Sequence, residues 1–165
     1  MTTRLEDAEA VDLLQQMIRN ACVNDGTRES GEEARSVDLL RQYLGGSGFE
    51  VEQFEPQPGR ASLLAKIEGT DPTAPTLMLM GHTDVVPVNP DGWSRDPFSG
   101  DVVDGMVWGR GAVDMLNLTA TQAVAFKRLA QSGFRPKGTL LYLAVADEEA
   151  LGTWGAHWLV DHELD

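Results

Sequence analysis

The amino-acid sequence predicts an α/β fold in which a central sheet lies between two layers of helices. The order of the expected elements is the first observation behind this prediction, because two helices, several strands, a helix, a strand and a helix follow one another. The second is that apolar runs at residues 77–80 and 140–146 end in histidine or acidic residues, as strands often do at their carboxyl ends in such proteins. The chain has 165 residues with 42% apolar content, which suffices for one ordinary domain with a core.

Two helices are expected at the start of the chain. Apolar side chains in residues 7–22 recur at helical spacing on one side, and the sequence Asn24-Asp25-Gly26 interrupts that pattern. Ser30 and Glu33 have the spacing of a capping box, so a second helix is expected to begin there. Gly45-Gly46 is expected to end it, because glycine adopts the left-handed conformation found at helix ends.

Several segments have the patterns of strands. Residues 49–54 alternate between apolar and polar side chains, which indicates a half-buried strand, and residues 61–67 form a second. Residues 77–80 are apolar at every position, so this strand is expected at the centre of the sheet with both faces covered. Residues 101–108 carry Asp-Gly near their middle and are expected to form a hairpin, and residues 139–146 form the last strand.

Two further helices are expected on either side of that last strand in the sequence. Residues 114–131 are apolar on most sides, which predicts a buried helix, and Gly133 is expected to cap it. A final helix is expected to start near Ala150 and to extend past Trp158, and the histidines there, His157 and His162, are expected at the surface.

Composition narrows the possible classes of function. The net charge of −13, from 13 basic and 26 acidic residues, argues against a nucleic-acid partner, whose phosphates require a basic surface. No apolar run approaches the roughly 20 residues needed to span a bilayer, so no membrane partner is expected. The first residues lack a secretory signal pattern, and the cytoplasm is the expected location. Cys22 is the only cysteine, which excludes an internal disulfide and a cysteine-type zinc site.

One histidine and four acidic residues follow the apolar runs and are candidates for chemistry. His82 and Asp84 stand two apart after the first run, so a strand there would place both on one face. Asp114 stands where the long helix is expected to begin, and Glu148 and Glu149 follow the second run. Each has a simpler interpretation alone, since an aspartate can cap a helix and an acidic pair suits a helix start. Together, imidazole and carboxylates are ligands that zinc takes, which favours a metal site.

Four segments follow one another along the chain: GHTDVVP, W-x-x-DPFSG, DG-x-x-x-GRGAVDM and the DEE that follows a strand. In this order they resemble the dinuclear zinc hydrolases of the aminoacylase, acetylornithine deacetylase, succinyl-diaminopimelate desuccinylase and glutamate carboxypeptidase family, in peptidase clan MH. The resemblance begins near Asn24 and reaches the end of the chain. It implies a zinc-peptidase-like catalytic domain with a mixed central sheet. Residues 1–165 would be its N-terminal portion, without the lid and dimerisation domain and without the C-terminal part.

The resemblance also implies a role for each candidate residue. His82, Asp114 and Glu149 would be metal ligands, with the Asp114 carboxylate bridging two zinc ions per active site in the complete enzyme. Cobalt or manganese would also suit these donors. Asp84 would be a catalytic residue that helps the ligand histidine, since a bound imidazole usually donates its other N–H to a carboxylate. Glu148 would be the general base that takes a proton from water.

The function that follows is metal-dependent hydrolysis of an amide bond, as a metallopeptidase or a deacylase. The expected substrates are a dipeptide, a carboxypeptidase-type substrate or an N-acyl amino acid, and the expected assembly of the complete enzyme is a homodimer. The alternative is a truncated, non-catalytic fragment that binds metal or a partner, and the 165-residue chain alone is expected to be inactive. The family often reads D-M-K-G where this chain has Asp114-Met115-Leu116-Asn117, which leaves the substrate open. A flavodoxin-like domain is a poor alternative, because Gly109-Arg110-Gly111 does not connect a strand to a helix as a phosphate-binding loop does.

Overall fold

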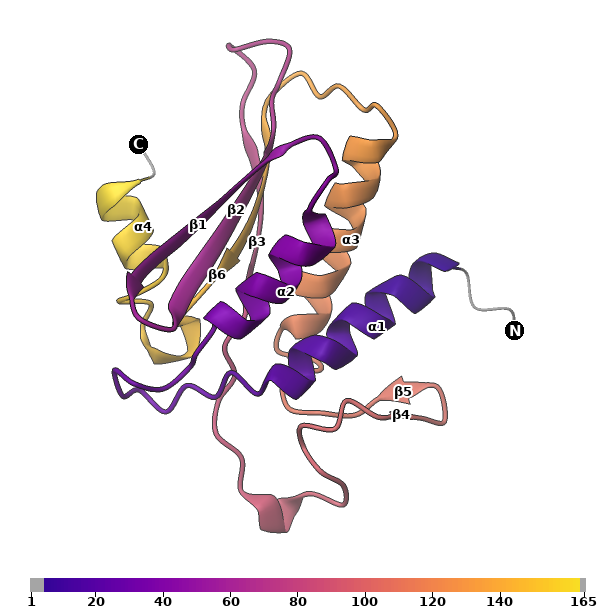
Figure 1. Ribbon diagram of the computed structural model, residues 1–165, viewed down its shortest axis with the longest axis vertical. Helices are drawn as coiled ribbons and strands as arrows, with labels where there is room; N and C mark the ends of the chain where they lie inside the picture. Colours follow the sequence, from indigo (N-terminus) through magenta and orange to yellow (C-terminus); the bar gives the residue numbers. More distant parts are fainter. Residues whose placement is uncertain (1–4, 164–165) are drawn as a thin grey trace.

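A mixed sheet forms the centre of the fold (Figure 1). The computed structural model describes residues 5–163, and within them the sheet has four strands in the order β1-β2-β6-β3. These strands are β1 (Glu50–Gln57), β2 (Arg60–Ile67), β3 (Leu77–His82) and β6 (Leu140–Val145). β2 pairs antiparallel with β1 and with β6, whereas β3 runs parallel to β6. The carboxyl ends of β3 and β6 therefore lie next to each other.

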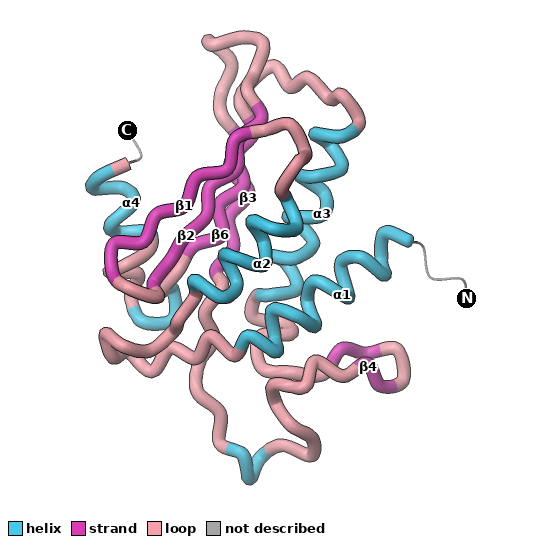
Figure 2. The backbone as a smooth tube through the Cα atoms, viewed as in Figure 1, coloured by secondary structure: helices cyan, strands magenta, loops and turns pink. Residues whose placement is uncertain are grey.

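Helices cover both faces of this sheet. The helices α1 (Leu5–Asn20), α2 (Ala34–Leu44) and α3 (Leu116–Gln131) lie on one face, and α4 (Ala156–His162) lies on the other (Figures 1 and 2). The alternation of side chains along β6 shows the same division. Tyr142 and Ala144 pack into the larger core, whereas Leu143 and Val145 pack with Leu159 of α4. The predicted three-layer α/β fold with a mixed sheet is confirmed.

The larger core is formed by aromatic and aliphatic side chains from α1, α2, α3 and the face of the sheet that these helices cover. Phe126 of α3 is fully buried, and its ring packs edge to face with Phe49 at a centroid distance of 5.1 Å. Burying a side chain of this kind stabilises the fold by roughly 1.5–3 kcal/mol. α1 packs along α3 and contributes the buried Met17 and Ile18. No helix within residues 5–163 has both the length and the apolar content needed to cross a membrane.

The prediction that residues 77–80 form the central strand of the sheet is wrong for the described chain. β3 pairs only with β6 there and forms an edge of the sheet, with Leu77 60% and Met80 50% exposed. An apolar run indicates a strand suited to burial, but it does not specify which neighbours the strand has. The hairpin prediction is confirmed, because β4 (Val102–Val103) and β5 (Met106–Val107) pair antiparallel.

Three predictions about helices also need correction. Glu33 makes no side-chain capping bond, so it does not form a capping box with Ser30; its carboxylate binds Arg60 instead. α3 is buried on one side rather than most sides, because Leu118 is 50% exposed. The last helix starts at residue 156, not 150.

The late start of α4 has a local cause. Residues Glu148–Ala150 form a short 3-10 helix, η2, and a second such turn, η1 (Pro90–Gly92), occurs earlier in the chain. Leu151 and Gly152 follow η2 with positive φ angles of 74° and 71°, a left-handed conformation that a right-handed helix cannot include.

Candidate metal centre

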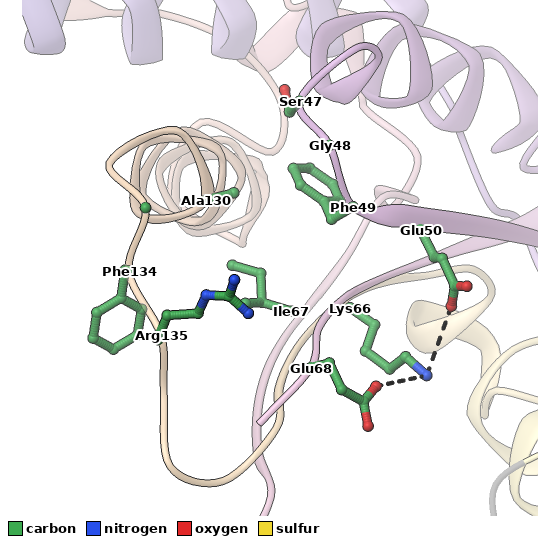
Figure 3. A pocket seen from close by; sticks show the side chains of 11 residues that line it. Ser47, Gly48, Phe49, Glu50, Lys66, Ile67, Glu68, Ala130, Phe134 and Arg135 are labelled. Atoms are coloured by element: carbon green, nitrogen blue, oxygen red, sulfur yellow. Dashed lines mark ion pairs between the residues drawn. The ribbon is translucent and has the colours of Figure 1, made fainter. Parts of the chain in front are cut away.

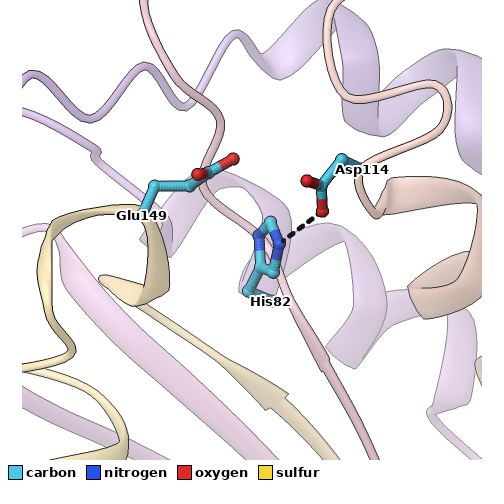
Figure 4. Close-up of side chains that lie close together, drawn as sticks. All are labelled: His82, Asp114 and Glu149. Carbon is cyan, nitrogen blue, oxygen red and sulfur yellow. Dashed lines mark hydrogen bonds and ion pairs between the residues drawn. The ribbon is translucent and has the colours of Figure 1, made fainter.

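Three side chains from separate parts of the sequence converge on one point at the carboxyl ends of β3 and β6 (Figure 4). His82 ends β3, Glu149 lies in η2 just after β6, and Asp114 lies just before α3. One ligand atom from each residue can be chosen so that all lie within 4.8 Å of one another. The parallel pairing of β3 with β6 places His82 opposite Val145, and this register brings the first two residues together.

Close contact between α3 and β3 fixes the end of the strand that carries His82. Gly81 makes this contact possible, because a Cβ atom at this position would collide with the Thr119 hydroxyl oxygen. The Thr119 hydroxyl donates to the His82 carbonyl oxygen at 2.8 Å. The buried Tyr142 hydroxyl in turn donates to the Thr119 carbonyl oxygen at 3.0 Å, so strand, helix and sheet are joined by hydrogen bonds at this level.

The orientation of the His82 ring follows from the partners of its two nitrogens. Nδ1 lies 2.9 Å from the Asp84 carbonyl oxygen, which can only accept a hydrogen bond, so Nδ1 carries a hydrogen. Nε2 lies 3.2 Å from Asp114 Oδ1 and 3.6 Å from Glu148 Oε2. A nitrogen that faces two carboxylates is suited to a cation, either a proton or a metal ion. Nε2 is therefore the ring atom available for a metal.

The Asp84 carboxylate lies behind the centre and is fully buried. It accepts hydrogen bonds from the backbone N–H groups of Glu148 and Glu149, at 3.2 and 3.1 Å, and from the Asn24 amide at 2.8 Å. Its Oδ1 atom is 3.6 Å from His82 Nδ1, farther than the carbonyl oxygen of the same residue. In this structure the backbone of Asp84 orients the imidazole, and its side chain holds the turn that carries the two glutamates.

Negative charge is concentrated around the three converging residues. Burial raises the pKa of the Glu149 carboxyl above its ordinary value, and the nearby carboxylates of Asp114, Asp84 and Glu148 raise it further, while His82 lowers it. The Asp114 and Glu148 side chains are 80% and 57% exposed, which leaves the centre open to solvent. Such a group of carboxylates around one imidazole favours the binding of cations.

Comparison with known proteins identifies the family of the chain. Residues 78–165, more than half of the chain, match the family described as peptidase family M20/M25/M40. The chain belongs to this family. The predicted resemblance to these hydrolases is thereby confirmed.

The relatives of this M20 chain include two succinyl-diaminopimelate desuccinylases. The one from Rhodopseudomonas palustris strain BisA53 is 42% identical over 129 residues, which cover 74% of this chain and 33% of the relative. The one from Phenylobacterium zucineum strain HLK1 is 35% identical over 154 residues, which cover 93% of this chain and 38% of the relative. The chain thus spans about a third of the length of the curated relatives it matches.

Solved structures of M20 proteins share the fold. Human carnosine dipeptidase 1 aligns with a TM-score of 0.73 and 26% identity, over 94% of this chain and 35% of that one. The dipeptidase Dug1p from Saccharomyces cerevisiae gives a TM-score of 0.64 at 22% identity, over 87% and 33% of the two chains. A dinuclear metal binding peptidase of family M20 from Bacillus subtilis gives 0.57 at 18% identity, over 93% and 39%. The last two likenesses concern the fold alone.

A buried ionic network beneath the centre of this M20 chain was missed by sequence reasoning. Arg60 donates to both carboxylate oxygens of Glu33 at 2.8 Å and to Asp147 Oδ1 at 2.7 Å. All three residues are at most 2% exposed. The spacing of Ser30 and Glu33 predicts a capping role for Glu33, and nothing in the spacing of Glu33, Arg60 and Asp147 relates these three positions. The contact depends on the tertiary fold, so no local pattern signals it.

Figure 3 shows a hollow in the surface that none of the three converging residues lines. It is lined by the start of β1, the end of β2 and the segment that follows α3: Ser47, Gly48, Phe49, Glu50, Lys66, Ile67, Glu68, Ala130, Gly133, Phe134 and Arg135. Because β2 is antiparallel to β6, this hollow is at the amino end of β6, opposite to the candidate centre. Lys66 already pairs with Glu68 at 3.1 Å and with Glu50 at 3.7 Å.

The two late histidines take no part in the candidate centre. Both His157 and His162 are exposed, as predicted, and the His162 ring stacks on Trp158 at a centroid distance of 4.7 Å. Within residues 5–163, only one group of three histidine, cysteine or acidic side chains is close enough together to share a metal ion. It consists of His82, Asp114 and Glu149.

Proposed function

We propose that this chain is the N-terminal portion of the catalytic domain of a metal-dependent hydrolase that cleaves an amide bond. The observation that carries the proposal is the convergence of an imidazole and two carboxylates, from three separate segments, at the carboxyl ends of β3 and β6. Ligand sites in open α/β sheets form at this end of the strands. Membership of the M20 family and the similarity to desuccinylases support the same reaction class.

The donor set fits zinc ions. Zinc takes imidazole nitrogen and carboxylate oxygen at about 2.0–2.2 Å, so two atoms that share one ion lie no more than about 4 Å apart. His82 Nε2 and Asp114 Oδ1, at 3.2 Å, meet this condition. All three ligand atoms lie within 4.8 Å of one another, so these side chains would together hold two ions, with Asp114 as the ligand common to both. Paired catalytic metals are typically about 3.5–4 Å apart. Cobalt or manganese would suit the same donors.

Bound metal supplies Lewis acidity, which polarises the carbonyl of the substrate and lowers the pKa of water. The side chains of this protein would transfer the proton, bind the metal and hold the site in position. Glu148 is 57% exposed and lies 3.6 Å from His82 Nε2, so its carboxylate is free to take a proton from water and pass it to the leaving amine. His82, Asp114 and Glu149 would hold the metal. Asp84 belongs to the catalytic machinery through its carbonyl contact to His82 and its carboxylate contacts to the turn of Glu148.

Two substrate classes fit the proposal equally. The desuccinylase relatives favour an N-acyl amino acid, and the likeness to human carnosine dipeptidase 1 favours a short peptide. Both substrates present an amide next to a carboxylate-bearing residue, so a single assay panel covers them. The cytoplasmic location, the homodimer and the absence of nucleic-acid or membrane partners stay predictions.

The test uses the protein at its full natural length, with zinc or cobalt added, on a panel of dipeptides and N-acyl amino acids. We expect Glu148→Gln to lower turnover by roughly 100-fold or more with unchanged metal content, which is the usual scale of lost acid–base catalysis. Glu149→Gln should instead lower the metal content. Glu52→Gln, at an exposed position of β1, is the matched control and should change neither.

Two outcomes of this test would contradict the proposal. Metal loss in Glu148→Gln with nearly normal turnover would mean that the two glutamates have exchanged roles. Turnover by the 165-residue chain alone, at roughly 1 per second or faster, would contradict the expectation that this portion is inactive by itself.

A further inference from the structure

A network of buried polar side chains lies directly beneath the turn that carries Glu148 and Glu149. Its members come from five separate segments, and each is at most 3% exposed: Asn24, Glu33, Arg60, Asp84 and Asp147. The network contains three carboxylates, one guanidinium and one amide. Burial of this many polar groups is costly unless every group is bound, so the way in which they are bound shows what the network holds in place.

The network binds the turn through its backbone. The N–H groups of Asp147, Glu148 and Glu149 are consecutive, and each donates to a buried carboxylate. The acceptor is Glu33 for the first N–H, at 3.1 Å, and Asp84 for the other two, at 3.2 and 3.1 Å. Asp147 has a φ angle of 64°, a left-handed conformation that is uncommon in residues other than glycine. The position of this turn thus depends on where the two acceptor carboxylates are held.

Two donors hold those carboxylates. Arg60 binds Glu33 through two parallel hydrogen bonds and also reaches Asp147 Oδ1 at 2.7 Å. The Asn24 side-chain amide donates to Asp84 Oδ2 at 2.8 Å and to Asp147 Oδ1 at 3.0 Å. The carboxylates of Asp84 and Asp147 thus share one amide nitrogen. Asn24 therefore joins two acidic groups that would otherwise repel each other at close range.

Asn24 is itself fixed in place. Its backbone N–H donates to the Val85 carbonyl oxygen at 2.8 Å, and Val23 and Val85 form an isolated parallel bridge. Its side-chain oxygen accepts from the Gly26 N–H at 3.1 Å, which points the amide nitrogen toward the carboxylates. The first loop of the chain is thereby attached to the segment that follows His82.

We propose that Asn24 and Arg60 are positioning residues for Glu148 and Glu149. They act through Asp84, Glu33 and Asp147, which hold the three backbone N–H groups of the turn. The inference rests on the proposed function in one respect, namely that Glu149 binds metal and Glu148 is the base. The geometric part, that Asn24 and Arg60 hold the turn, does not depend on metal and is tested without it.

Amide hydrogen exchange of the chain without metal, followed by NMR, tests the geometric part. Asn24→Ala should speed exchange at the Glu148 and Glu149 amides by about 10-fold or more, the scale expected when a hydrogen bond to a charged group is lost. The amide of Leu143 in β6 should keep its rate. Asn20→Ala is the matched control, because the Asn20 amide donates to the Ser36 hydroxyl outside the network.

Arg60→Lys is the second variant, because lysine keeps the positive charge but lacks the planar fork that binds Glu33. The exposed Arg41, paired with Asp38, provides its control as Arg41→Lys. Cobalt titration, with the visible spectrum of the bound ion, should show affinity about 10- to 100-fold lower in Arg60→Lys and in Asn24→Ala, as is typical for residues that support metal ligands.

The outcomes distinguish the positioning role of Asn24 and Arg60 from the proposed metal centre. Unchanged exchange at the two glutamate amides in folded Asn24→Ala and Arg60→Lys would overturn the positioning role, and so would equal acceleration throughout the sheet. If the unmodified chain and its full-length form bind no cobalt, the proposed metal centre is wrong, while the exchange data still decide the positioning role. Local acceleration together with weaker cobalt binding supports both.

Discussion

Replacing Arg60 by methionine should destabilise the fold severely. Methionine replaces the aliphatic stem of arginine but has no guanidinium group, so the change removes both hydrogen bonds to Glu33 and the bond to Asp147. Asp147 keeps the Asn24 amide and the Trp154 N–H, whereas Glu33 keeps only the Asp147 N–H among the bonds described above. The uncompensated charge is therefore that of Glu33, which is 0% exposed. Breaking a buried ion pair in this way costs about 3–5 kcal/mol.

The loss in the free energy of unfolding caused by Arg60→Met should depend on pH in a defined direction. Burial raises the pKa of the Glu33 carboxyl above its ordinary value even though Arg60 opposes the shift, and removing Arg60 raises it further. An acid whose pKa is higher in the folded state binds protons preferentially there, so acidification stabilises the folded variant more than the unmodified protein. The destabilisation should therefore be largest near pH 8 and smaller near pH 5.

Urea unfolding of the chain at several pH values, followed by circular dichroism, measures this deficit. For a chain of this size, about 3–5 kcal/mol corresponds to a fall of roughly 6–20 °C in the midpoint of thermal unfolding. Arg41→Met is the control, because the Arg41 pair with Asp38 is half exposed and should be worth only about 0–1 kcal/mol. A deficit below about 1 kcal/mol, or one that grows as the pH falls, would refute the reasoning.

Two further predictions concern the core. Gly81→Ala should lower the free energy of unfolding by about 1–3 kcal/mol, because the new methyl group would collide with Thr119 and force α3 away from β3. Gly92→Ala, where a Cβ atom meets nothing within 4 Å, is the control; equal effects in urea titrations would contradict the clash. Cys22 should react with Ellman's reagent only as the chain unfolds, because its thiol is buried and burial raises its pKa. Fast reaction in the native protein would show that the packing around it is loose.

Sequence reasoning located the candidate centre better than it located the surrounding sheet. Apolar runs that end in His82 and Glu149 are local patterns, and the sheet brings these strand ends together because β3 and β6 are parallel neighbours. The edge position of β3 could not be predicted in the same way. An apolar strand is suited to a central place, and which strands pair with it depends on contacts distant in the sequence.

The buried polar network shows more clearly that local sequence patterns do not predict contacts between distant residues. Glu33 has the spacing of a capping residue, yet its carboxylate binds Arg60, a residue 27 positions away. Two partners of the Asp147 side chain, Asn24 and Arg60, come from the first loop and from β2. Local patterns identify which residues can act as ligands. They do not show which buried groups hold those ligands in position.

The central claim is that His82, Asp114 and Glu149 hold metal, and its most direct test is anomalous diffraction at the zinc edge. Crystals of the full-length protein grown with zinc should show a peak about 2.0–2.2 Å from His82 Nε2 and from an Asp114 oxygen. A second peak should lie between Asp114 and Glu149, about 3.5–4 Å from the first. Zinc bound only at other residues, such as His157 or His162, with no peak at these three side chains, would contradict the account.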